Sequence, residues 1–145
     1  MSEELHYFNE DAQEQLQMME SALLDAMDKG VNDEYIGTIF RAMHTIKGVA
    51  GMFSFEKIIS FTHIAENLMD AVRNSKIVLD EELLMLLLRC KDHVASLVES
   101  AVTSTSLGVQ SRMKIQNSKN LSTPILAHLR KREKTQRQHK RSKSK

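Results

Sequence analysis

Proline and glycine, the residues that interrupt helices, are scarce in this chain of 145 residues, which contains one proline and five glycines. Tryptophan is absent. Because proline and glycine mark turns and strand ends, their scarcity argues against many short strands and favours long helices. Hydrophobic residues still make up 41% of the chain, which is enough for a core. The length suits one domain with an appendage.

Cysteine is also nearly absent, and the single Cys90 excludes a framework of disulfides within the chain. Because Cys90 follows a run of leucines, we expect a small buried hydrophobic residue in a reducing compartment. No apolar run reaches the roughly 18 residues of a membrane span. The acidic N-terminus lacks the basic-then-apolar order of a signal peptide. We therefore expect a soluble, cytoplasmic protein.

Acidic side chains are scarce in the last quarter of the chain and basic ones are outnumbered before it, although the net charge is only +1. Residues 1–111 carry 8 basic and 18 acidic side chains, whereas residues 112–145 carry 12 basic side chains and one acidic one. Blocks of opposite sign indicate two different segments. We divide the chain into a domain at 1–104, a linker at 105–122 and a basic tail at 123–145.

Apolar residues recur at steps of three and four over four segments, the pattern of amphipathic helices. The first segment covers 3–29 and the second covers 32–53. A third begins after Ser54, which we expect to be its N-cap, and a fourth runs from 80 to about 103. Four helices with one apolar face each predict an all-α fold, an antiparallel four-helix bundle with short connections.

The basic tail can form an additional C-terminal helix before a disordered end. Thr123 suits an N-cap, and Pro124 suits the first helical position. The tail has none of the interleaved aromatic residues of nucleic-acid-binding segments. We expect a solvated linker that acts at most by nonspecific electrostatics. Nucleic acid, an anionic membrane or an acidic protein remain alternative partners for it.

The second helix places a histidine beside a glycine, in the run FRAMHTIKGVAG at 40–51. Lys47 and Gly48 follow His44 by three and four residues and so share its helix face. The third helix carries His63 and Glu66 outside its apolar line. Counted outward from a turn after residue 53, these two lie at about the same height as His44 in an antiparallel hairpin. We expect them to face His44.

The run FRAMHTIKGVAGMFSF, followed by THIAENLMDAVR, resembles the histidine phosphotransfer (Hpt) domain. It is most similar to the N-terminal phosphoacceptor domain of CheA-type chemotaxis kinases, over about residues 1–104. The resemblance implies an Hpt-type bundle in which His44 is phosphorylated and Lys47, His63 and Glu66 surround it. It also implies two partners, the catalytic domain of a histidine kinase and the receiver domain of a response regulator.

Physical chemistry assigns a role to each of these groups. Imidazole is partly neutral near pH 7 and can attack a phosphoryl group through Nε2 if Nδ1 carries the proton. Glu66 can accept that proton in a hydrogen bond and orient the ring. Lys47 can offset phosphoryl charge, and His63 can bond to either Glu66 or the phosphoryl group. The surface expected to dock partners comprises Phe40, Arg41, Gly48 and Gly51.

Several alternatives remain open at this point. Gly48 can give partners access to His44, or it can simply allow a close contact between helices. His44, His63 and Glu66 could hold a metal, but Lys47 would repel a divalent cation, so we expect no metal and no cofactor. His6 and His93 have no role in this scheme and are expected at the surface.

The expected activity is that of a carrier and not of an enzyme, because the chain has no glycine-rich nucleotide-binding motif. It would form part of a kinase only if it is a fragment of a CheA-like protein. The alternative function is a helical interaction bundle without phosphotransfer. The cognate kinase and receiver, the signal and the oligomeric state stay open.

Overall fold

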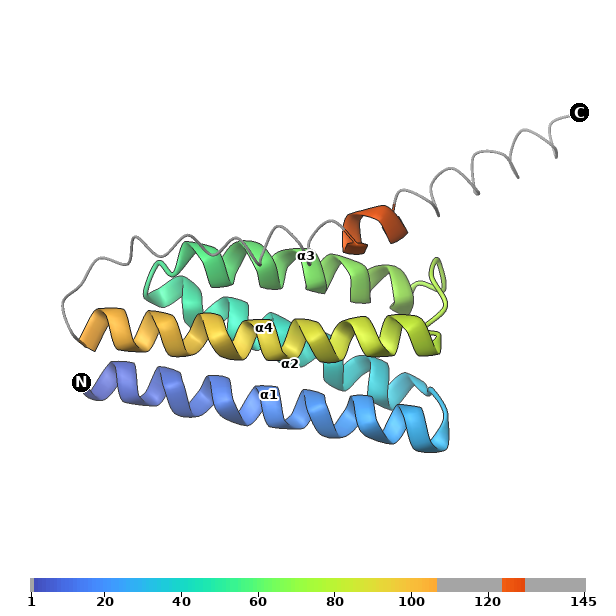
Figure 1. The fold of residues 1–145 in the computed structure, drawn as a ribbon, viewed down its shortest axis with the longest axis horizontal. Coiled ribbons are helices and arrows are strands. Elements are labelled where there is room, and N and C mark those ends of the chain that lie inside the picture. The colour runs from blue at the N-terminus through green and yellow to red at the C-terminus, as the bar shows by residue number, and fades with distance from the viewer. Residues whose placement is uncertain (1, 107–123, 130–145) are drawn as a thin grey trace, which may run out of the picture.

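Four long helices form the molecule in the computed structural model, which describes residues 2–106 and 124–129. The helices are α1 (Glu3–Lys29), α2 (Asp33–Met52), α3 (Glu56–Arg73) and α4 (Glu81–Ser106). They run up, down, up and down, and each packs on two neighbours (Figure 1). This arrangement confirms the predicted all-α antiparallel bundle.

Polar side chains cap three of the helices. Ser2 Oγ accepts the Leu5 N–H at 3.2 Å, and Asn32 Oδ1 accepts the Tyr35 N–H at 2.8 Å. Asp80 Oδ1 accepts the Leu83 N–H at 2.9 Å. Each bond satisfies a backbone donor that has no partner inside its helix. These three helix starts therefore follow from local sequence.

The start of α3 differs from the prediction. Ser54 lies in the turn with a φ of 56°, and the N-cap is Phe55, which makes no side-chain capping bond. A serine cap needs an extended backbone, whereas this short reversal needs a left-handed residue. Glu56 still opens the helix, where the helix dipole favours its charge. The other helix boundaries lie within about three residues of those expected.

The core fills the space between the helices, and the polar or charged residues buried with it in the described part of the chain are Thr62, Glu66 and His93. It is built from leucine, isoleucine, methionine and alanine at the predicted steps, and Cys90 is buried among them as expected. Burial raises the pKa of the Cys90 thiol to about 12. No helix among the described residues is both long enough and apolar enough to cross a membrane.

His93 is a correction to the surface position expected for it. Its side chain lies in the bundle and packs edge-on against Phe61, with ring centroids 4.7 Å apart. His93 stands three residues after Cys90 and four before Leu97, which places it on the apolar line of α4. Burial lowers the pKa of His93. His6, in contrast, is exposed and pairs with Glu10.

The short helix at 124–129 packs on the bundle. Ile125 has an exposed fraction of 0% and belongs to the hydrophobic core, and Leu129 packs against that core. This part of the basic tail is therefore anchored on the protein and is not a free solvated extension. The expected Thr123 cap, the linker from 107 onward and the end of the tail lie outside the described residues.

Candidate functional site

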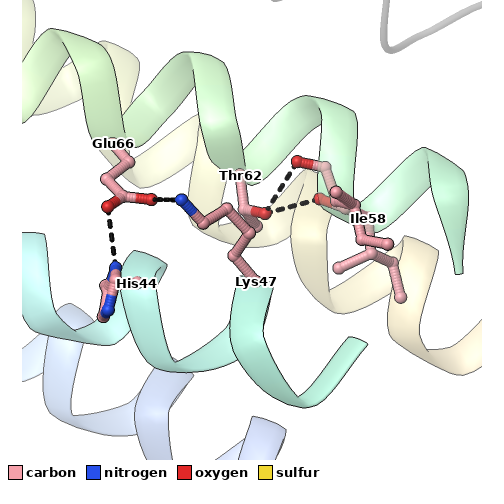
Figure 2. A network of polar contacts seen from close by, with 6 residues as sticks. His44, Lys47, Ile58, Thr62 and Glu66 are labelled. Atoms are coloured by element: carbon pink, nitrogen blue, oxygen red, sulfur yellow. Dashed lines mark hydrogen bonds and ion pairs between the residues drawn. The ribbon is translucent and has the colours of Figure 1, made fainter. Parts of the chain in front are cut away.

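Helices α2 and α3 bring His44 and Glu66 together across their interface. His44 Nδ1 lies 2.7 Å from Glu66 Oε1. The other carboxylate oxygen, Oε2, lies 2.5 Å from Lys47 Nζ. Figure 2 shows the Glu66 carboxylate reaching from α3 toward the two side chains of α2. The predicted juxtaposition of His44, Lys47 and Glu66 is confirmed as geometry.

The three side chains differ in their contact with solvent. The exposed fraction is 63% for the His44 side chain, 26% for Lys47 and 12% for Glu66. Glu66 is thus a buried carboxylate whose partners are both supplied by α2. A buried charge is tolerated only when it is paired and hydrogen-bonded, so Lys47 and His44 together account for this acid in the α2–α3 interface.

The ionisation of Glu66 follows from two opposing effects. Burial alone raises the pKa of Glu66 because it disfavours the charged carboxylate. Hydrogen bonds and charge from Lys47 and His44 outweigh burial, and the resulting pKa is below the ordinary value of 4.5. Glu66 is therefore ionised near neutral pH and can only accept hydrogen bonds.

An acceptor at Nδ1 determines the tautomer of His44. Because Glu66 is a carboxylate, Nδ1 must carry the proton that lies between them. In the neutral ring Nε2 then holds a free lone pair. The ring is mostly exposed. Glu66 holds Nδ1, and the lone pair of Nε2 therefore stays available for a reaction.

His63 is less engaged than its predicted role requires. It is exposed, and within the described part of the chain it makes no hydrogen bond or ion pair. Glu66 already uses one oxygen for His44 and the other for Lys47. The His63–Glu66 hydrogen bond, one of the two alternatives that the sequence left open, is therefore not formed among the described residues. The alternative expectation, contact with a phosphoryl group, remains a prediction.

Gly48 and Gly51 leave open space on the face of α2 that carries His44. A Cβ built at either position would meet nothing within 4 Å. Close contact between helices, the alternative reason for Gly48, is therefore excluded within the described residues. Open space around a glycine at a helix surface suits access from outside the molecule.

Two ring contacts of Phe40, which was expected on the docking surface, add Arg73 to the residues that the sequence predicted. The Phe40 ring lies parallel to the His44 ring at 6.1 Å, with an angle of 6° between their planes. The Arg73 guanidinium carbon lies 4.3 Å from the centre of the Phe40 ring. Arg73 follows Glu66 by seven residues, two helical turns, and this spacing is the sequence signal that could have identified it.

A metal site is the remaining alternative interpretation of these residues. No group of three or more His, Cys, Asp or Glu side chains within the described ranges is arranged to hold a metal ion. The site is thus a solvent-facing imidazole on a helical bundle, held at one nitrogen by an ion-paired carboxylate. An exposed histidine held in this way on a helical bundle defines the structural class of this protein.

Comparison with known proteins agrees with this class. Residues 3–100 match the Hpt domain family, so the chain belongs to that family. It is similar to the chemotaxis protein CheA of Rhizobium meliloti, with 36% identity over 101 residues that cover 70% of this chain. It is also similar to CheA of Salmonella typhimurium, with 40% identity over 85 residues and 59% of this chain.

The matched region is a small part of those relatives. It covers 13% of the length of each of the two CheA proteins. Among solved structures, the chain resembles the phosphorylated P1 domain of CheA3 in complex with CheY6 from R. sphaeroides. The TM-score is 0.78 at 24% identity, over 88% of this chain and 95% of that chain. This likeness shows that the two share a fold.

Proposed function

We propose that the chain is a phosphotransfer module in which His44 receives a phosphoryl group from ATP on a separate kinase domain. His44 then passes the group to an aspartate of a receiver domain. The observation that carries this proposal is the 2.7 Å contact between His44 Nδ1 and Glu66 Oε1 beneath an exposed ring. It leaves Nε2 as the nucleophile on the solvent side.

The first transfer uses each group in turn. The Nε2 lone pair attacks the γ-phosphorus, the bond to the bridging oxygen breaks, and ADP leaves with that electron pair. The ring becomes a phosphorylated cation that keeps its proton on Nδ1. Glu66 stabilises this cation through the existing hydrogen bond, because an ionised acceptor makes the stronger bond. Lys47 offsets negative charge on the incoming phosphoryl oxygens.

The second transfer reverses these changes. A carboxylate oxygen of the receiver attacks phosphorus, the N–P bond breaks, and its electrons return to Nε2. His44 is then the neutral ring that it was at the start. Both steps require a large partner to approach in line with Nε2, and the open space at Gly48 and Gly51 provides room for it. Phe40 and Arg41 complete the proposed docking surface.

The relatives support the identity of the partners. The matched proteins are named chemotaxis protein CheA, and the solved neighbour was crystallised with CheY6. We therefore propose that this chain acts in the cytoplasm in chemotaxis-type signalling, with a CheA-type catalytic domain as donor and a CheY-type receiver as acceptor. We further propose that the bundle at 1–104 is the functional domain, followed by a linker and a basic tail.

A labelling experiment tests the proposal. The chain is incubated with the catalytic domain of a CheA-type kinase and γ-labelled ATP, and the label is followed onto a CheY-type receiver. We expect label that is acid-labile and alkali-stable, that is lost in His44→Gln, and that moves to the receiver. His6→Gln, at an exposed histidine on α1, is the matched control and should label normally.

Two results would contradict the proposal. Label that persists in His44→Gln would assign another acceptor. An unlabelled wild-type chain, tested with several CheA-type kinases that label their own Hpt domains, would favour a helical interaction bundle without phosphotransfer.

A further inference from the structure

Arg73, Phe40 and His44 form a continuous series of contacts that the proposed chemistry does not use. The Arg73 guanidinium carbon lies 4.3 Å from the Phe40 ring centre. The Phe40 ring lies 6.1 Å from the His44 ring and within 6° of parallel to it. Both distances fall within the ranges of energetically significant cation–π and aromatic contacts.

His44 and Glu66 share one level of the α2–α3 interface, and Phe40 and Arg73 lie to one side of it. Phe40 precedes His44 by four residues, one turn, while Lys47 follows it by three. On α3, which runs antiparallel, Arg73 lies two turns beyond Glu66 on the Phe40 side, and its guanidinium carbon lies 4.3 Å from the Phe40 ring centre. Phe40 and Lys47 of α2 therefore lie on either side of His44. From α3, Arg73 contacts Phe40 and Glu66 pairs with Lys47.

One hydrogen bond does not define the position of an exposed ring. Glu66 holds Nδ1, but a ring that is 63% exposed can still tilt and rotate about that bond. A parallel aromatic neighbour restricts the remaining freedom, because the two rings keep most contact when their planes stay aligned. In-line attack on phosphorus depends on such orientation.

We propose that Arg73 is a positioning residue that acts through Phe40 to hold the plane of the His44 ring. The inference rests on the proposed phosphotransfer function for its importance, although the ring geometry can be measured without it. Arg73 fixes the Phe40 ring from α3, and Phe40 in turn aligns the ring of His44. The bundle thus controls the acceptor at two points, Glu66 at a nitrogen and Phe40 at the ring plane.

Kinetics of phosphorylation test this role. We expect Arg73→Gln to lower kcat for labelling by about 2- to 5-fold with KM unchanged, the size expected from losing an exposed cation–π contact. Phe40→Leu should lower it by about 2- to 10-fold. Arg73→Lys should restore most of the rate, because a lysine can also lie over a ring. Arg89→Gln, at an exposed arginine on α4, is the control and should behave as wild type.

The double variant separates action through Phe40 from a direct action of the Arg73 charge. If Arg73 works through Phe40, adding Arg73→Gln to Phe40→Leu should change the rate little, because the contact is already lost. If the two losses multiply, Arg73 acts on the phosphoryl group independently and the inference is wrong. An Arg73→Gln rate equal to that of wild type would also overturn it.

A measurement on the free protein makes this inference independent of phosphotransfer. Residual dipolar couplings of the His44 ring C–H bonds report the orientation and order of the ring, and we expect full couplings in wild type and Arg89→Gln. Arg73→Gln and Phe40→Leu should reduce these couplings, because the aligned neighbouring ring is released or lost, while Glu66 still holds the Nδ1-protonated tautomer. Unchanged couplings in both variants would overturn the inference. If instead wild type fails to accept label while the couplings change as expected, the proposed function fails and the positioning role stands.

Discussion

Glu66 shows how a single residue can serve both the fold and the chemistry. It is a buried carboxylate, and its two oxygens lie 2.7 Å from His44 Nδ1 and 2.5 Å from Lys47 Nζ. A buried acid without partners would be costly. With these partners, the same charge holds α3 to α2 and sets the tautomer of the exposed ring.

Replacing Glu66 by glutamine should separate orientation from charge. The amide oxygen can still accept the Nδ1–H, but it cannot balance the cation that forms when Nε2 is phosphorylated. We expect Glu66→Gln to remain folded and to be labelled on the order of 100-fold more slowly, as when a charge-stabilising group is lost. Labelling kinetics and circular dichroism provide the two measurements. A destabilised but folded variant with an unchanged labelling rate would make Glu66 a structural residue only.

The lowered pKa of Glu66 also predicts how stability depends on pH. A carboxyl whose pKa is lower in the folded than in the unfolded state stabilises the fold above the unfolded value, and this contribution is lost as the pH falls through the folded value. The advantage of wild type over Glu66→Gln should thus be complete at pH 7 and shrink below about 4.5. Denaturant unfolding at several pH values measures it. A difference that is constant from pH 7 to 3 would contradict the assignment.

His93 predicts a second pH effect, in a higher range. Its Nε2 is buried and has no hydrogen-bond partner among the described residues, and burial lowers the pKa of His93. Unfolding therefore takes up a proton as the pH falls below the ordinary value of 6.5, so stability decreases there and levels off below the folded pKa. In His93→Leu this decrease should be smaller, and stability at pH 7 should be equal or higher by about 1 kcal/mol. His6→Gln is the control and should keep the wild-type dependence.

The site residues were predictable to different degrees. His44, Lys47 and Glu66 could be placed together because helix periodicity and a short hairpin determine their level and face. His93 was misplaced because its polar character was given more weight than its position on the apolar line of α4. The contact of Arg73 with Phe40 depends on the rotamer of a long side chain, which periodicity does not determine.

At the scale of elements, helix periodicity predicted the bundle well, and the turns were less predictable. The first helix has the expected bounds, because a serine cap before it and a glycine after it act locally. The turn between α2 and α3 is set instead by the packing of those two helices. That packing forces a left-handed backbone on Ser54, which the serine side chain does not favour.

Glycine at position 54 should therefore stabilise the bundle. Ser54 is exposed and has a φ of 56°, a conformation that glycine adopts without a steric cost. We expect Ser54→Gly to raise the free energy of unfolding by about 0.5–1 kcal/mol, after the greater freedom of glycine in the unfolded chain is subtracted. Ser60→Gly, on the exposed face of α3, should lower it by about 0.5 kcal/mol. If both substitutions change the free energy of unfolding by the same amount, the backbone at Ser54 is not strained.

At the scale of the whole molecule, the charge division has a structural counterpart. Residues 1–111 carry most of the acidic side chains, and the basic side chains are concentrated from residue 112 onward. The helix at 124–129 is anchored by Ile125 in the hydrophobic core, so the basic segment begins at a defined place on the acidic bundle (Figure 1). Composition could separate the two segments, but it could not show that apolar residues of the second pack on the core of the first.

Ile125 and Leu126 provide a matched test of this anchor. Ile125 has an exposed fraction of 0%, whereas that of its neighbour Leu126 is 40%. We expect Ile125→Ala to lower the free energy of unfolding by about 2–4 kcal/mol, because it removes buried methyl groups and leaves a cavity. Leu126→Ala should cost less than about 1 kcal/mol. Denaturant unfolding of both variants, beside a chain truncated after residue 122, measures the anchor. If Ile125→Ala matches Leu126→Ala, residues 124–129 do not contribute to the folded core, and the basic segment is attached to the bundle only through the chain that precedes it.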